Sequence, residues 1–192
     1  MFGNDNKKID NILNPLKINK DSTIEFTIGE LKDAGMWKFK KIIEFTAAGR
    51  FYSRYIIHSD LYEDEMILEA FPAKTLLEVY LYKLSDTIPF SEDFLDVAGQ
   101  RYLTTPDGNE YMRCIMPNNE ERIDGIKGKI KVLDVNTNDI ERNGEVTIWD
   151  YEKQEDGLTK FVNVEMTEEN GMFRIFTGEM IEEIFYKIYL GE

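Results

Sequence analysis

His58 is the only histidine in this 192-residue chain and the side chain best suited to acid–base chemistry near neutral pH. It is followed by Ser59 and Asp60, so the three residue types of a hydrolytic triad stand side by side. Triads are assembled in space from separated positions, whereas neighbours on a strand alternate between its two faces. We therefore predict that His58 is a strand-end histidine and not a catalytic base.

Cys114 is the only cysteine, and it lies in the segment YMRCIM on the face shared by Met112 and Met116. Free cysteines are often buried as small apolar residues, and burial raises the pKa of a thiol. We predict a core residue, with a His58–Cys114 dyad as the alternative. One cysteine excludes an internal disulfide, which suits a reducing compartment, and we expect a cytoplasmic protein.

A stretch at 134–145, DVNTNDIERNGE, places oxygen-bearing side chains at four ligand positions of a calcium loop: Asp134, Asn136, Asn138 and Glu145. However, Asp139 stands where that loop needs glycine, and its flanks KIKVL and EVTIW have the pattern of strands. We predict a hairpin loop without calcium. Structural zinc needs four cysteine or histidine ligands, so we expect neither a metal nor an organic cofactor.

Paired carboxylates are the remaining candidates for catalysis, because glycosidases and magnesium sites use them. Clusters occur at Glu63/Asp64/Glu65, at Glu92/Asp93 and at Glu120/Glu121. Consecutive acids in an acidic chain are usually solvated. A hydrolase that uses Asp93 with Glu120 is therefore our alternative to a protein without catalytic residues.

Two further motifs could bind anions. The segment GIKGK (125–129) lacks the spacing of a phosphate-binding loop, and its glycines predict a bend or bulge before a strand. Lys38, Lys40 and Lys41 form a small basic patch with Trp37 and Phe39 interleaved. We interpret it as a surface strand end, with contact to anionic lipid or to an acidic protein as the alternative.

Strands must position most of these residues, because a two-residue apolar period dominates from Thr23 onward. Turn signals predict three hairpins, at Pro106-Asp107-Gly108, at Asn143-Gly144 and at 168–171. The segment LLEVYLYKL (76–84) is apolar on both faces, which predicts a central strand covered on both sides. Ser91 and Gly99 bound a predicted short helix in FSEDFLDVAG.

Helical spacing is confined to the two ends of the chain. Ile9, Ile12, Leu13 and Leu16 predict an N-terminal amphipathic segment over 1–18, and Met180, Ile181, Ile184, Phe185 and Ile188 predict a C-terminal helix over 178–189. Residues 19–192 form one β-rich domain in this interpretation. The expected fold class is α+β: a mostly antiparallel twisted sheet or partly open barrel with short N-terminal and C-terminal helices.

The net charge of −14 argues against nucleic-acid binding, which needs clustered lysine and arginine. Residues 1–59 hold 10 basic and 7 acidic side chains, whereas residues 60–192 hold 13 basic and 30 acidic ones. An apolar run long enough to span a membrane is absent, so we do not expect an integral membrane protein. The acidic half predicts a protein partner with a basic surface, and self-association stays open.

The order of elements resembles the YjfK-like family of uncharacterised bacterial proteins over about residues 21–188. The segments that carry the resemblance are TIEFTIGEL, RFYSRYIIHSD with MILEA, LLEVYLYKLSDTIPFSEDFLDVAG, YMRCIMPNNEERIDGI, EVTIWDYEK, KFVNVEM and FRIFTGEMIEEI. The resemblance implies no known activity and assigns no catalytic residue. It implies an accessory protein of envelope-stress systems that include membrane-remodelling coiled-coil proteins.

We therefore expect a non-enzymatic interaction or accessory module of a bacterial system, with a coiled-coil membrane-remodelling protein among the candidate partners. A carboxylate-dependent hydrolase is the first alternative. A phage-encoded structural or host-interaction protein is the second.

Overall fold

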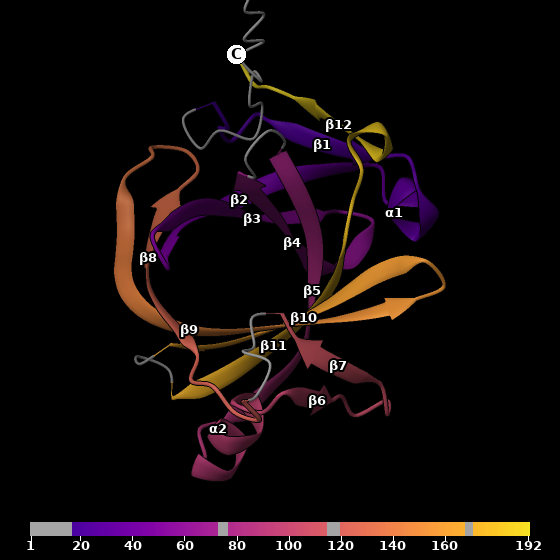
Figure 1. Ribbon diagram of the computed structural model, residues 1–192. Coiled ribbons are helices and arrows are strands. Elements are labelled where there is room, and N and C mark those ends of the chain that lie inside the picture. Colours follow the sequence, from indigo (N-terminus) through magenta and orange to yellow (C-terminus); the bar gives the residue numbers. More distant parts are fainter. Residues whose placement is uncertain (1–16, 73–76, 115–119, 168–170) are drawn as a thin grey trace, which may run out of the picture.

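Eight antiparallel strands close into a barrel in the computed structural model, which describes residues 17–72, 77–114, 120–167 and 171–192 (Figure 1). Around the barrel the order is β2-β3-β4-β5-β11-β10-β9-β8, and β8 returns to pair with β2. Their bounds are β2 Met36–Ala47, β3 Arg50–Ser59, β4 Tyr62–Pro72, β5 Leu77–Pro89, β8 Ile126–Asp134, β9 Ile140–Glu155, β10 Leu158–Thr167 and β11 Met172–Met180. The β-rich antiparallel architecture expected from the sequence is confirmed.

Two glycines allow close approach of neighbouring strands in the barrel wall. A Cβ at Gly128 of β8 would lie 2.9 Å from both the Ala47 Cβ and the Thr46 carbonyl oxygen of β2. A Cβ at Gly178 of β11 would overlap the Leu81 carbonyl oxygen and the Tyr82 ring of β5. The glycine at 128, interpreted from the sequence as a bend or bulge, instead lies in regular pairing with Ala47 and Val146.

Short elements cover the outside of the barrel at two places. Strand β1 (Thr23–Phe26) pairs with the first residues of β2 and with β12 (Tyr186–Tyr189), and helix α1 (Gly29–Asp33) and the 3-10 turn η1 (Glu183–Phe185) lie beside them. Helix α2 (Glu92–Ala98) lies with β6 (Tyr102–Thr104) and β7 (Glu110–Arg113) on the opposite side of the barrel in Figure 1. Both sets bury apolar side chains against the outer face of the wall.

Most of the apolar core therefore lies outside the barrel wall. Trp37, Tyr55 and Leu68 belong to a cluster under β1 and β12, and Trp149 and Phe173 belong to a cluster under α2. A third and smaller cluster, which includes Phe45 and Ile130, faces the barrel interior. Strand β5 separates the interior from the outer core, so the prediction of a doubly covered strand at 76–84 is confirmed.

The predicted C-terminal helix over 178–189 is wrong. Met180 ends β11, and residues 186–189 form β12, which pairs with β1 from Phe26↔Tyr186 to Thr23↔Tyr189. The same apolar spacing fits a strand here because the segment YKIY is rich in aromatic and β-branched residues. Pairing also satisfies the backbone groups of β1, and Ile188 lies opposite the fully buried Ile24.

The hairpin predicted at Asn143-Gly144 is also wrong. Both residues lie inside β9, where they pair with Lys131 and Ile130 of β8. The chain turns earlier, at 135–139, where the Asp134 carboxylate accepts hydrogen bonds from the backbone amides of Asn136 (2.7 Å) and Thr137 (3.0 Å). This bonding fixes the turn before the asparagine–glycine pair is reached.

Other local predictions hold. Ser91 caps α2 by accepting a hydrogen bond from the Phe94 backbone amide at 3.1 Å, and β6 and β7 form the hairpin around Gly108. Strands β10 and β11 pair as expected, from Thr167↔Met172 onward, although 168–170 lie outside the described residues. The N-terminal segment predicted over 1–18 also lies outside them, apart from Lys17 and the buried Ile18.

Candidate functional site

Charged side chains point into the barrel from its inner face. In the sequence, the alternation along each strand shows only that these residues lie on its polar face. Arg54 of β3, Glu69 of β4 and Glu165 of β10 are 3%, 7% and 1% exposed. Strands β3 and β10 are not neighbours in the sheet, so the contact between Arg54 and Glu165 crosses the barrel. We call Arg54, Glu69, Glu165, Asn163 and Asp150 the interior cluster.

Arg54 is the centre of the interior cluster. Its Nε donates to Glu69 Oε2 at 2.5 Å, its Nη1 donates to Glu165 Oε1, and its Nη2 donates to Asn163 Oδ1 at 3.2 Å. Asn163 in turn donates to Asp150 Oδ1 at 2.6 Å. The two buried carboxylates are thus paired with one guanidinium, the arrangement that buried charges require.

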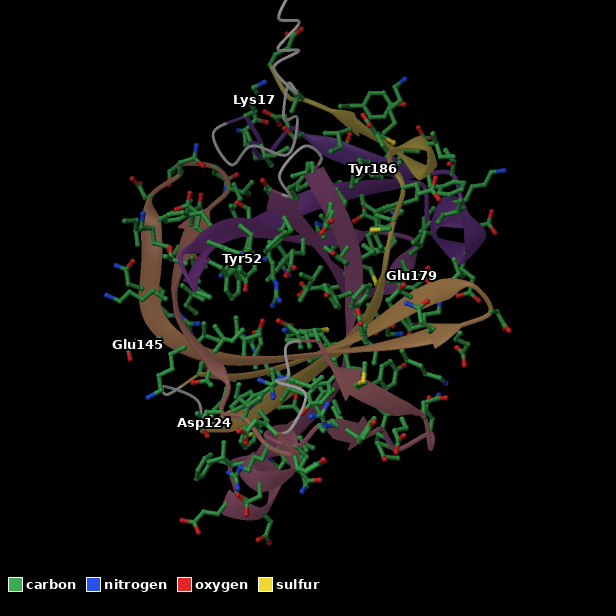
Figure 2. The ribbon with its side chains drawn as sticks, viewed as in Figure 1. Lys17, Tyr52, Asp124, Glu145, Glu179 and Tyr186 are labelled. Carbon is green, nitrogen blue, oxygen red and sulfur yellow. The ribbon has the colours of Figure 1, made fainter. Side chains whose placement is uncertain are left out.

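Aromatic rings surround this guanidinium. Arg54 Cζ lies 4.6 Å from the ring centroid of Phe45, and the rings of Tyr52, Tyr82 and Phe176 lie within 6.0 Å. Figure 2 shows Tyr52 inside the ring of strands. Burial raises the pKa values of Tyr52 and Tyr82 above the ordinary value, so both phenols stay neutral. The middle of the barrel is therefore filled by side chains.

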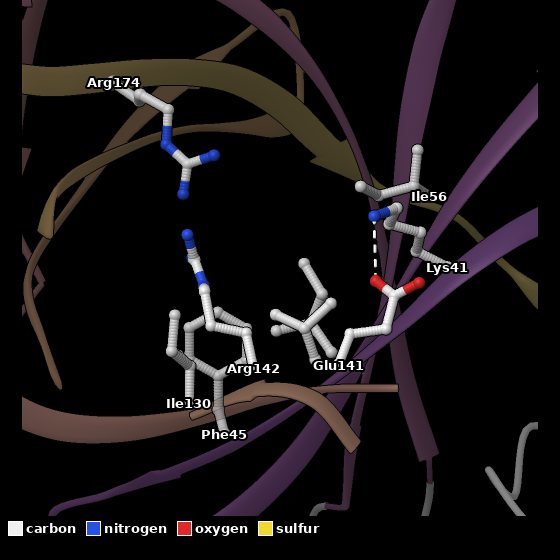
Figure 3. A pocket seen from close by; sticks show the side chains of 9 residues that line it. Lys41, Phe45, Ile56, Ile130, Glu141, Arg142 and Arg174 are labelled. Atoms are coloured by element: carbon white, nitrogen blue, oxygen red, sulfur yellow. Dashed lines mark hydrogen bonds and ion pairs between the residues drawn. The ribbon is translucent and has the colours of Figure 1, made fainter. Parts of the chain in front are cut away.

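A cavity of about 210 Å³ opens at the end of the barrel where β8 turns into β9. We call it the mouth cavity. Figure 3 shows its lining: Lys41, Ile43, Phe45, Ile56, Ile130, Val132, Glu141, Arg142 and Arg174. Five of these nine residues are apolar, three are cationic and one is a carboxylate. Small-molecule sites combine an apolar wall with a few convergent polar groups in this way.

The cationic side chains of the mouth cavity come from three strands. Lys41 of β2 forms an ion pair of 2.9 Å with Glu141 of β9. Arg174 of β11 donates to Glu165 Oε2 at 3.1 Å, which links the mouth cavity to the interior cluster. Burial lowers the pKa of Arg174, and the charges of Arg54 and Arg142 lower it further. Two of the three cations at this end of the barrel are thus paired with carboxylates.

A second hollow, of about 420 Å³, lies between α1 and the strands β4, β5, β10 and β11. Its floor includes Met66 and Leu81, which belong to the outer wall, and its cations are already paired. Lys160 forms an ion pair with Glu179, and Lys83 forms one with Asp64. The lining of this second hollow holds two lysines and two glutamates, so its charges are balanced.

The structure does not assemble a triad around His58. The Ser59 hydroxyl donates to the Ala34 carbonyl oxygen, and the Asp60 carboxylate accepts from Lys38 Nζ at 2.7 Å. His58 lies on β3 opposite Lys38, as a strand-end residue, which agrees with the prediction.

Cys114 is exposed, so the prediction that it fills the core is wrong. It follows the end of β7, where its backbone amide donates to the Asp150 carbonyl oxygen at 2.9 Å. Strand β7, which ends just before Cys114, pairs with β6 and β9 and not with β3, the strand of His58. Met116, which was expected to share a face with Cys114, lies outside the described residues.

Several of the predicted carboxylate and lysine groups form ion pairs at the outer surface, whereas Lys41 lines the mouth cavity. Asp64 pairs with Lys83, and Glu65 pairs with Lys40. Trp37 and Phe39 point into the outer core, 0% and 3% exposed, so they are not interleaved with lysines on one surface. Strand alternation separates Lys38 from Trp37 and Phe39, and the β-bulge between Phe39 and Lys41 changes the alternation before Lys41.

Asp93, Glu120 and the 134–145 residues occupy separate places. Asp93 is exposed in the first turn of α2, Glu120 is exposed before β8, and neither lines the mouth cavity. Asp134 and Asn136 stabilise the β8–β9 turn, whereas Glu145 lies on β9 opposite Lys129. Among the described residues, no group of three or more histidine, cysteine or acidic side chains is placed to hold a metal ion.

Sequence analysis missed both the interior cluster and the two arginines of the mouth cavity. The available signal was a charged residue inside otherwise apolar strands: Arg54 in FYSRYII, Glu69 in MILEAF and Glu165 in FVNVEM. The alternation of apolar and polar residues along each strand was interpreted as one buried face and one face in solvent. In a closed barrel, the second face points into the interior.

Comparisons with protein-family models, with curated proteins and with solved structures found no significant match to this chain. None of the helices in the described part of the chain is long and apolar enough to cross a membrane. The evidence for function is therefore the architecture itself. In the part of the chain that the structure describes, it is a closed antiparallel barrel with a charged interior and an apolar-walled cavity at its mouth.

Proposed function

We propose that this protein is a non-enzymatic binding module that takes up a small organic ligand in the mouth cavity. The observation that carries the proposal is the convergence of Arg142 and Arg174 on an apolar-walled cavity in the end of an eight-stranded barrel (Figure 3). Barrels of this size are either filled by side chains or hold one small ligand. Here the interior cluster fills the middle and leaves the mouth for a ligand.

The chemistry of the lining supports binding over catalysis. Its nine residues include no histidine or cysteine, and its one carboxylate, Glu141, is paired with Lys41. General acid–base catalysis needs a titratable group positioned for proton transfer, and arginine does not give up its proton near neutral pH. The proposal keeps the sequence-based expectation of a non-enzymatic module and locates its site.

A plug variant tests the proposal. Ile56→Trp places a large ring in the mouth cavity, whereas Thr46→Trp places the same ring on an exposed position of β2. Thermal unfolding is measured for both variants and the wild type with a panel of small anionic, cationic and neutral organic compounds. A ligand at 100 times its Kd adds about 2.7 kcal/mol, which raises the midpoint of a chain of this size by about 5–10 °C.

We expect at least one compound to produce that shift in the wild type and in Thr46→Trp, and the shift to be lost in Ile56→Trp. Native mass spectrometry provides a second readout. We expect the mass of a bound ligand on the purified wild-type protein and not on the Ile56→Trp variant. The proposal is wrong if no compound shifts the wild type, or if the plug variant responds as the wild type does.

We also propose that the acidic outer surface meets a protein with a basic surface. The ion pairs Lys38–Asp60, Lys40–Glu65 and Lys83–Asp64 show that outer-surface lysines already face carboxylates, so the excess carboxylates face solvent. The resemblance to the YjfK-like family, with its implied envelope-stress and coiled-coil partners, stays a prediction. A phage-encoded origin also stays open.

Salt dependence tests this surface. We expect partner proteins to be recovered from a bacterial lysate at about 0.05 M salt and lost at about 0.5 M, because salt screens exposed charges. A variant with Glu63→Gln, Glu92→Gln and Asp93→Asn should recover less at low salt. Recovery of no protein at low salt, with a monomeric chain, would contradict the proposal.

A further inference from the structure

Strand β12 lies at one end of the strand order. In the part of the chain that the structure describes, β12 pairs with β1 alone, and Figure 1 shows it at the outside of the molecule. The eight strands of the closed barrel leave no edge among themselves, so β12 is an edge of the described sheet. The backbone N–H and C=O groups of an edge strand can pair with a further strand.

The pairing with β1 shows which backbone groups of β12 point away from the sheet. The Thr27 amide donates to the Phe185 carbonyl oxygen at 2.9 Å. Residues opposite each other in an antiparallel pair alternate between bonded and non-bonded pairs. Along the register from Phe26↔Tyr186 to Thr23↔Tyr189, this alternation makes Tyr186 and Ile188 the non-bonded residues. Their N–H and C=O groups therefore point toward the outer edge of β12.

The side chains at this edge favour an apolar occupant on one face. Tyr186 and Ile188 pack against the outer core, so an added strand would extend that apolar layer. Exposed apolar side chains flank the same strand: Ile184, which is 73% exposed, Tyr189 and Leu190. Apolar residues of an added strand would bury part of this surface.

Charge distinguishes a basic partner from a second copy of the chain. Residues 181–192 carry three exposed carboxylates, Glu182, Glu183 and Glu192, and one cation, Lys187. Pairing of β12 with its own copy would bring two such acidic segments together, each in a chain with a net charge of −14. A strand that carries lysine or arginine would instead be attracted to these carboxylates.

We propose that an extended segment of a basic partner protein adds to β12 as an antiparallel strand and bonds to the backbone of Tyr186 and Ile188. Its apolar residues lie over the outer core, and its basic residues alternate with them on the solvent face. This inference rests on the proposed basic partner of the acidic surface and adds the place and mode of contact.

Three synthetic hexapeptides with blocked ends test the mode of contact. The first, KIKVKV, alternates basic and apolar residues, KIKPKV replaces its central valine with proline, and EIEVEV reverses its charge. Fluorescence anisotropy measures the binding of each labelled peptide to the full chain at about 0.05 M salt. We expect KIKVKV to bind at least about tenfold more tightly than either control, because proline removes a backbone donor and glutamate is repelled.

Hydrogen exchange in the wild type locates the contact. With KIKVKV bound, the amides of Tyr186 and Ile188 should exchange more slowly, because they gain hydrogen bonds. The amide of Lys187 is the internal control, since Lys187 belongs to a bonded pair with Glu25 of β1 and should change less.

Variants of the edge test the same contact. Ile188→Pro removes an outward N–H group without removing a bond to β1, and it should weaken KIKVKV binding at least about tenfold. Ile188→Ala keeps the N–H group and should weaken binding less than about threefold. Glu182→Gln combined with Glu183→Gln should weaken it about threefold at low salt. If near-ultraviolet circular dichroism shows that Ile188→Pro is unfolded, hydrogen exchange decides.

The outcomes separate this inference from the proposed basic partner. Strand addition is wrong if no peptide binds, if a control peptide binds as tightly as KIKVKV, or if Tyr186 and Ile188 gain no protection. It is also wrong if folded Ile188→Pro binds as the wild type does, or if a dimer of the chain protects these amides. The basic partner still stands if protein is recovered from lysate at low salt by both the wild type and Ile188→Pro. If no peptide binds and no protein is recovered, both are wrong.

Discussion

Replacement of Arg54 by methionine is expected to lower the free energy of unfolding by about 3–5 kcal/mol. Arg54 holds Glu69 and Glu165, and all three are buried. Methionine fills a similar volume but leaves Glu69 without its cation in the barrel interior. Urea unfolding followed by tryptophan fluorescence measures the loss, which is a large fraction of a typical domain stability of about 5–15 kcal/mol.

Two further variants identify the cause. Arg54→Met combined with Glu69→Met removes the uncompensated charge, and it should recover much of the lost stability. Lys38→Met breaks the exposed pair with Asp60 and should cost less than about 1 kcal/mol. If Arg54→Met is no more destabilising than Lys38→Met, the interior cluster does not stabilise the barrel as argued.

The penalty in Arg54→Met should also depend on pH. Burial raises the pKa of Glu69, whereas Arg54 lowers it by charge and by hydrogen bonding. Without Arg54, the folded state holds a proton on Glu69 at pH values where the unfolded chain has released it. Stability relative to the wild type is then greatest at low pH and falls as pH rises through the raised pKa. We expect a smaller deficit at about pH 5 than at about pH 8.

Phe173→Ala is expected to cost about 3–5 kcal/mol, because a large ring is removed from a closed apolar cluster. Phe173 is 0% exposed on the outer face of β11. Its ring centroid lies 4.7 Å from that of Phe94 on α2 and 6.0 Å from that of Trp149 on β9. Phe173 therefore joins α2 to the barrel wall, and chemical denaturation measures the effect of its loss.

Hydrogen exchange adds a local readout for the same variant. Amides of α2 should lose protection in Phe173→Ala to a greater extent than amides of β3, which lies away from this cluster. Phe51→Ala is the control, since Phe51 is 70% exposed, and its stability should change by no more than about 0.5 kcal/mol. A loss below about 1 kcal/mol for Phe173→Ala would show that α2 is held by other contacts.

The sequence predicts local structure well where one short-range signal acts without competition. Ser91 and Gly99 bound α2, and Gly108 lies in the β6–β7 hairpin, because capping and turn chemistry depend on nearby residues. The sequence-based prediction fails at Asn143-Gly144, because β9 continues to pair with β8 through a dipeptide that is typical of turns. The sequence-based prediction fails again at 186–189, where a segment with helical spacing forms a strand that pairs with β1.

The candidate site was not predictable from the sequence, for a related reason. Arg54, Glu69, Arg142, Glu165 and Arg174 come from five strands and are well separated in the sequence. A two-residue period shows which residues share a face of a strand, but it does not show whether that face meets solvent or a barrel interior.

The sequence by itself determined the β-rich antiparallel class, the short helix at 92–98 and two of the three predicted hairpins, because these depend on periodicity and on turn or cap residues close in the chain. Only the tertiary structure decided that β8 pairs with β2 and closes the barrel. That pairing joins residues about 90 positions apart and turns the polar faces of the strands inward. Barrel closure also brings Arg142 and Arg174 to one cavity. Long-range strand pairing depends on the whole sheet, so no single segment of the sequence predicts it.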